Sequence, residues 1–204
     1  MDEDGRAVIT TDQASRENIQ NTLSEYENQY LKFDRDGRLD VEYLNNCQST
    51  SENFTALKSL AQSDITYLFS TASEYSNSGK NEILVGEQAS GTTGVTLLPG
   101  AQVDPSPDNN VYIIVSNLLG KEKQASTTAH EAYGHAYFYD LKMHGKNVNP
   151  YHNYQPVFLG MTFDENLNIE VATFGRQDMN IELATQIKIV ENQAINNYRM
   201  KTRK

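Results

Sequence analysis

Cysteine is nearly absent from this sequence of 204 residues. The single cysteine, Cys47, excludes an internal disulfide bond, and it excludes a structural zinc site that needs two or more thiolate ligands. The fold therefore does not depend on an oxidising compartment, although export of such a chain is still compatible with this. The ligands expected for a zinc ion are then imidazole and carboxylate groups.

Long apolar runs are also missing. The longest ones, such as residues 111–115, are far too short to span a bilayer, so no membrane-spanning segment is expected. The N-terminal stretch MDEDGRAVITT is acidic and lacks the apolar centre of a signal peptide. These features leave the localisation open, and they are compatible with a domain excised from a larger secreted or effector protein.

Basic residues are scarce as well. Lysine and arginine number 17, against 27 aspartate and glutamate residues, which gives a formal net charge of -10. Nucleic acid and anionic membrane surfaces are both bound through clustered cations, so neither is an expected partner. With 38% apolar and 22% charged residues, the composition indicates one globular domain over residues 1–204.

Hydrophobic periodicity and turn residues predict an α+β domain. The order is helices first, then a small sheet, then two later helices that are split by a β-insert. The expected elements are a helix at 11–30 capped by Thr11 or Asp12, a hairpin turn at 32–41, one or two helices at 52–72, short strands at 82–85, 95–98 and 111–116, a helix at 124–142, a loop at 144–156, a hairpin at 157–174 and a final amphipathic helix at 178–200.

The four histidines of the chain all lie within one segment of 23 residues. They are His130, His135, His144 and His152. The first two belong to the stretch HEAYGH, which has one residue more between its histidines than the zinc-protease motif H-E-x-x-H. Such clustering indicates a metal site, because histidines that serve only the core or the surface need not gather in this way.

The spacing of His130 and His135 makes a specific structural prediction. On a regular helix, a residue five positions along points about 140° away from the first, so the two rings could not share one ion. One inserted residue, accommodated as a π-bulge, restores a common face, and Gly134 is well placed to tolerate it. Glu131 would then lie beside the metal without binding it, where a general base for water belongs. A regular helix would remove the enzyme interpretation.

A third ligand is needed, and the last predicted helix offers one. The apolar stripe of that helix consists of Ala184, Ile187, Ala194, Ile195 and Tyr198. Glu191 falls on this stripe, and a carboxylate that faces a core is costly unless it is paired or bound to a metal. Glu191 is therefore the favoured third ligand. The alternatives that stay open are Glu170, Glu182, His144 and His152.

HEAYGH resembles the H-E-x-x-G-H zinc motif of dipeptidyl peptidase III. E-N-Q-A (191–194) is loosely similar to the third-ligand helix of that family, whereas E-V-A-T-F-G (170–175) resembles the third-ligand segment of clostridial neurotoxin light chains. Leu141 stands where the metzincin pattern requires a third histidine, so that pattern is not followed. More broadly, the chain resembles the zincin-like metallopeptidase domains at the C-termini of secreted bacterial polymorphic toxins.

These resemblances imply a zincin-like fold, with a small mixed sheet, an active-site helix and a C-terminal ligand helix. The resulting prediction is a zinc-dependent peptidase in which His130, His135 and Glu191 bind Zn²⁺ and Glu131 is catalytic. The expected partners are a peptide or protein substrate and other domains of a larger protein. One alternative is a non-catalytic zincin-fold binding or structural module of a larger secreted toxin or effector protein. A weaker alternative is a metal-dependent amidase that acts on cell-wall peptides.

Overall fold

A four-stranded sheet runs through the computed structural model, which describes residues 7–164 and 169–203. The strand order is β1 (Val8–Thr10), β2 (Tyr67–Ala72), β6 (Val111–Ser116) and β5 (Gly94–Leu97). The first three strands are parallel, and β5 pairs with β6 in the antiparallel sense, so β5 is an edge strand. β6 has the near-continuous apolar sequence that a strand buried on both faces requires.

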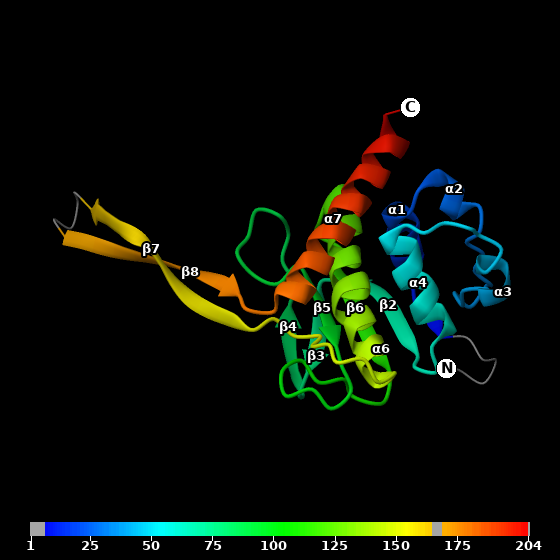
Figure 1. Cartoon of the computed structure of the whole chain (residues 1–204), viewed down its shortest axis with the longest axis horizontal. Coiled ribbons are helices and arrows are strands. Elements are labelled where there is room, and N and C mark those ends of the chain that lie inside the picture. Colours follow the sequence, from blue (N-terminus) through cyan, green and yellow to red (C-terminus); the bar gives the residue numbers. More distant parts are fainter. Residues whose placement is uncertain (1–6, 165–168, 204) are drawn as a thin grey trace.

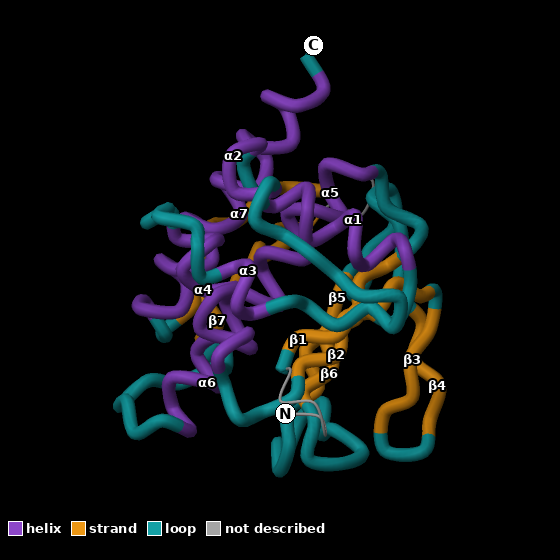
Figure 2. Tube along the Cα trace, turned by 90° about the vertical axis from the view of Figure 1, so that its right-hand side faces the viewer, coloured by secondary structure: helices purple, strands orange, loops and turns teal. Residues whose placement is uncertain are grey.

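Helices gather on one side of this sheet (Figures 1 and 2). The longer ones are α1 (Gln13–Thr22), α4 (Glu52–Gln62) and α7 (Ile181–Thr202). A continuous helical run contains α5 (Lys121–Thr128), the π-helix η1 (Ala129–Ala136) and α6 (Tyr137–Met143). The short helices are α2 (Glu25–Asn28) and α3 (Val41–Leu44). This arrangement confirms the predicted α+β class.

The main hydrophobic core lies between the sheet and the helices. Its largest fully buried side chains include Tyr67 and Phe69 of β2, Phe54, Leu57 and Leu60 of α4, and Tyr133 of η1. Burying one such side chain contributes about 1.5–3 kcal/mol. The hydroxyl of Tyr133 lies 2.9 Å from Oγ1 of Thr22, so its polar end is hydrogen-bonded inside the core. The buried side chain of Tyr133 therefore anchors η1 in this core.

Two hairpins complete the fold. β3 (Glu74–Asn77) pairs with β4 (Lys80–Ile83), and β7 (Tyr154–Asp164) pairs with β8 (Ile169–Asp178). The second hairpin projects far from the rest of the molecule (Figure 1). A register shift between Phe158 and Gly160 marks a β-bulge in β7. The predicted hairpin at 157–174 is confirmed, and it is longer at both ends.

The predicted helix at 11–30 is in fact two helices. Asp12 caps α1 through a hydrogen bond from the amide of Ser15. Ser24 then starts α2 in a capping box with Glu27, which is why the chain breaks there. Oε1 of the buried Glu27 also accepts hydrogen bonds of 2.5 Å from the hydroxyls of Ser49 and Ser51. One carboxylate therefore ties α2 to the start of α4.

Other expectations need correction. Of the one or two helices predicted at 52–72, the helical part ends at Gln62, and Tyr67–Ala72 is the internal strand β2, which pairs in parallel with β1 and β6 along its two edges. The strand β1 was not predicted. The turn at 32–41 is confirmed by the antiparallel bridge between Phe33 and Leu39 and by the left-handed φ of +82° at Gly37. Within the described part of the chain, no helix is both long enough and apolar enough to cross a bilayer.

Candidate metal centre

The helix that carries HEAYGH is widened, as the histidine spacing predicts. η1 covers Ala129–Ala136, which includes the whole motif. In a π-helix the hydrogen bonds join residues five apart, so positions i and i+5 lie on one face. Nε2 of His135 lies 3.3 Å from Nε2 of His130 as a result. The structure therefore brings the two predicted histidine ligands together.

Gly134 is needed at this point for packing and not for an unusual backbone. Its φ does not lie in the left-handed region that favours glycine. A Cβ atom at this position would lie only 2.6 Å from Cγ1 of Ile187 on α7. Because the glycine allows α7 to approach η1 so closely, Glu191, one turn beyond Ile187, comes next to His130.

A third histidine completes the cluster. Among the described residues, the side chains of His130, His135 and His152 form a group that could hold a metal ion, with one ligand atom of each lying within 4.8 Å of the others. His152 comes from the loop before β7, and its ring stacks on Tyr154 at a centroid distance of 4.9 Å. The side-chain amide of Asn180 donates two 2.8 Å hydrogen bonds to carbonyl oxygens of this loop.

Each of the three rings has its Nδ1 atom engaged by an oxygen. Nδ1 of His130 lies 3.0 Å from Oε1 of Glu191, that of His135 lies 2.6 Å from the carbonyl oxygen of Pro150, and that of His152 lies 2.5 Å from Oδ2 of Asp178. Because these oxygens can only accept, each Nδ1 is assigned the proton, and each Nε2 keeps a lone pair. All three rings are therefore held in the tautomer that binds a metal through Nε2.

The charges around the rings affect their protonation differently. Burial lowers the pKa of His130, but the hydrogen bond that its Nδ1 donates to Glu191 and the charge of Glu131 together outweigh it, so the pKa is raised. Burial lowers the pKa of His135, which favours its neutral form. Burial raises the pKa of Asp178, but the hydrogen bonds from His152 and from the backbone amides of Asn180 and Asn153 together outweigh it, so the pKa is lowered and the carboxylate stays ionised.

Glu131 lies beside the histidines and is held by the edge strand. Its side chain is 7% exposed, and its Oε2 accepts a 2.8 Å hydrogen bond from the hydroxyl of Thr96 on β5. The three histidines and Glu131 line a cavity of about 980 Å³, together with residues of β5, the loop after it and the base of the long hairpin. Asp104 also lines this cavity, and burial together with the charge of Glu131 raises its pKa.

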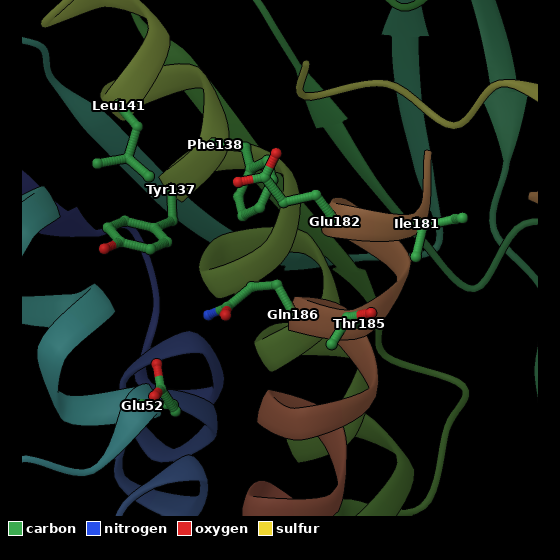
Figure 3. A pocket seen from close by; sticks show the side chains of 8 residues that line it. All are labelled: Glu52, Tyr137, Phe138, Leu141, Ile181, Glu182, Thr185 and Gln186. Carbon is green, nitrogen blue, oxygen red and sulfur yellow. The ribbon is translucent and has the colours of Figure 1, made fainter. Parts of the chain in front are cut away.

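The other predicted ligands lie elsewhere. Glu191 contacts Nδ1 of His130, on the far side of the ring from the nitrogen that faces His135. Glu170 is exposed on β8, paired opposite Phe163 in the projecting hairpin. Glu182 lines a separate pocket between α4, α6 and α7 (Figure 3). His144 contacts the carbonyl oxygen of Asp140 at the end of α6. None of these four belongs to the histidine group.

Sequence reasoning missed the residues that support the cluster. Asp178 is 26 positions from His152, and the two meet only because the register of the hairpin sets Asp178 opposite Tyr154. Thr96 reaches Glu131 because β5 is the edge strand, and no motif marks it. The predicted strand at 111–116 is the internal β6, and β5 is the edge strand that lines the cavity.

Comparison with family models, with curated proteins and with solved structures finds no match to this chain. The interpretation of the centre therefore depends on its own geometry.

Proposed function

We propose that this chain is a zinc-dependent peptidase of zincin-like architecture, and that His130, His135 and His152 bind the zinc ion. The observation that carries the proposal is the convergence of three histidines, each with its Nδ1 held by an oxygen, beside Glu131. Ligand histidines of metal sites generally donate their other ring N–H to a carboxylate or carbonyl in this manner. Three protein ligands and one open position are the pattern of catalytic zinc sites.

The separation of the ring nitrogens of His130 and His135 fits zinc. Two nitrogens that are each about 2.05 Å from one tetrahedral ion lie about 3.3 Å apart. The Nε2 atoms of His130 and His135 have a separation of 3.3 Å. Three neutral imidazoles are also a ligand set that zinc prefers, and the absence of a second cysteine leaves little competition from thiolates.

His152 takes the place that the sequence favoured for Glu191. Glu191 stands against the outer nitrogen of His130, where it orients the ring and strengthens it as a ligand. Asp178 does the same for His152, and the carbonyl of Pro150 does so for His135. The three histidines therefore depend on partners from α7, from the loop at residue 150 and from β8.

The chemistry assigned to the chain is hydrolysis of a peptide bond. A zinc ion held by His130, His135 and His152 would supply Lewis-acid chemistry, which activates a water molecule and polarises the scissile carbonyl. Glu131 accepts the proton of the attacking water and passes it to the leaving amine. Its position, next to both the histidines and the cavity, suits that role. The unpaired side of β5 lines the same cavity, and such an edge can hold an extended peptide by main-chain hydrogen bonds.

The experiment that tests the proposal combines metal analysis with a peptidase assay. Purified protein should bind one zinc ion, and cleavage of fluorescence-quenched peptides should fall at least about 100-fold in Glu131→Gln while zinc binding persists. His152→Ala should weaken zinc binding far more than Glu191→Gln does. Glu170→Gln, an exposed carboxylate on the projecting hairpin, is the matched control and should behave as the wild type. Protein that takes up no zinc would end the proposal.

A non-catalytic binding module of a larger protein is a second candidate function, and the projecting hairpin favours it. Four large apolar side chains of β7 are more than half exposed, namely Phe158, Leu159, Met161 and Phe163. A row of exposed apolar groups of this kind marks a contact surface. Zinc-loaded protein that binds peptides without cleaving any of them would favour this candidate over the peptidase.

A further inference from the structure

The edge strand β5 touches Glu131 at two positions. The hydroxyl of Thr96 lies 2.8 Å from Oε2 of Glu131 and 3.1 Å from its backbone carbonyl oxygen. Two residues earlier on the same face of the strand, Gly94 leaves room for the carboxylate. A Cβ atom at Gly94 would lie 3.1 Å from Cγ and 3.3 Å from Oε1 of Glu131, and 2.5 Å from Cγ2 of Thr127.

We infer that Thr96 is a positioning residue that fixes the carboxylate of Glu131 for proton transfer, and this inference rests on the proposed peptidase function. The hydroxyl has one proton to donate, and a charged carboxylate oxygen at 2.8 Å is a stronger acceptor than a carbonyl at 3.1 Å. With Oε2 engaged, Oε1 is the oxygen that accepts the proton from water. It lies on the side of Gly94, where a side chain would crowd it.

The geometry explains why the strand carries these two residues. A carboxylate at the end of a glutamate side chain has three rotatable bonds, and a base that is misplaced by an ångström loses much of its effect. Thr96 lies on β5, and the backbone of β5 is held by its antiparallel pairing with β6. The position of the Thr96 hydroxyl is therefore well defined. The loss of this hydrogen bond should therefore reduce turnover without weakening substrate binding.

The first experiment compares Thr96→Val with Thr96→Ser in zinc-loaded protein. Valine keeps the shape and removes the donor, whereas serine keeps the donor. With fluorescence-quenched peptides as the probe, kcat of Thr96→Val should fall about 10- to 100-fold with KM within about twofold of the wild type. Thr96→Ser should stay within about threefold. Thr55→Val, on the exposed side of α4, is the control for the same chemical change and should be unaffected.

A second experiment needs no activity. The ¹³C-labelled side-chain carboxylates of the glutamates are observed by NMR in the protein without added metal, and the Glu131 signal is the one that Glu131→Gln removes. Thr96→Val should shift this signal, while Thr96→Ser and Thr55→Val should leave it in place. A kcat of Thr96→Val equal to that of the wild type overturns the inference, and so does an unshifted Glu131 signal. Wild-type protein without hydrolytic activity, but with the expected NMR shift, refutes the proposed function and leaves the positioning contact established.

Discussion

Gly134→Ala adds one methyl group at the closest approach of η1 and α7. The new Cβ would lie 2.6 Å from Cγ1 and 3.3 Å from Cδ1 of Ile187. Because Cγ1 of a β-branched side chain on a helix has almost no rotational freedom, the clash cannot be relieved by a simple rotation. Overpacking of this kind costs about 1–3 kcal/mol. The higher helix propensity of alanine returns about 1 kcal/mol. The variant should therefore lose up to about 2 kcal/mol in the free energy of unfolding.

A double-variant cycle with Ile187→Ala separates the two contributions. Ile187 is 6% exposed, so its truncation alone should cost about 2–5 kcal/mol. In that background the methyl group of Gly134→Ala no longer meets Cγ1, and the substitution should stabilise the protein by about 1 kcal/mol. The effect of the same substitution thus changes sign. Urea unfolding of the wild type, the two single variants and the double variant gives four free energies of unfolding, provided that the m-value is the same in all four. Their differences give the coupling between the two sites.

The same substitution reports on the metal centre. If α7 moves away from η1, Glu191 moves with it, and its 3.0 Å contact with Nδ1 of His130 is lost. Loss of such a supporting contact lowers metal affinity by about 10- to 100-fold. Competition with a chromophoric zinc chelator measures this affinity. A Gly134→Ala protein that is more stable than the wild type and binds zinc equally well would refute the close-packing argument.

Two further predictions follow from the carboxylates. Asp178→Asn should lower zinc affinity about 10- to 100-fold in the chelator competition, because it weakens the hydrogen bond that Nδ1 of His152 donates to residue 178. Unchanged affinity would show that Asp178 does not support the ring of His152. Glu27→Gln should lower the free energy of unfolding by about 1–3 kcal/mol at pH 7. Burial raises the pKa of Glu27, but the hydrogen bonds from the hydroxyls of Ser49 and Ser51 and from Ser24 outweigh burial, so the pKa is lowered. The stability from this carboxylate is present above its unfolded pKa of about 4.3 and is lost as the pH falls through the lower folded value. Unfolding free energies should therefore decline less between pH 7 and pH 3 in Glu27→Gln than in the exposed control Glu42→Gln.

The sequence is most informative where a rule of local geometry leaves one solution. Two histidines five apart can share an ion only on a widened helix, and η1 is that widened helix. The cap at Asp12 and the hairpin near 157–174 are local features of the same kind. In each case the residues that decide the structure are neighbours in the chain, so their pattern can be read without knowledge of the fold.

Features that depend on pairing between distant segments could not be read in this way. Ile65, Leu68 and Phe69 fall at helical spacing, yet Leu68 and Phe69 belong to β2 because β1 and β6 flank that segment. The pair of His152 and Asp178 depends on the register of a hairpin with a bulge, and a shift of one residue would turn Asp178 to the other face. The contact of Thr96 with Glu131 likewise requires that β5 be the sheet edge.

Glu191 shows how far a physical rule extends on its own. A carboxylate on an apolar helix face has to be compensated, and the structure compensates it with the imidazole of His130. The rule is satisfied equally by a bound metal and by a hydrogen bond, so it could not choose between a ligand and a residue that orients a ligand. The choice depends on distance across the fold. Ile187 packs on Gly134 at the centre of η1, which leaves Glu191 one turn along α7, level with the outer nitrogen of His130. His130 and the other two histidines of the group line the same cavity as Glu131 and β5, where a substrate can enter.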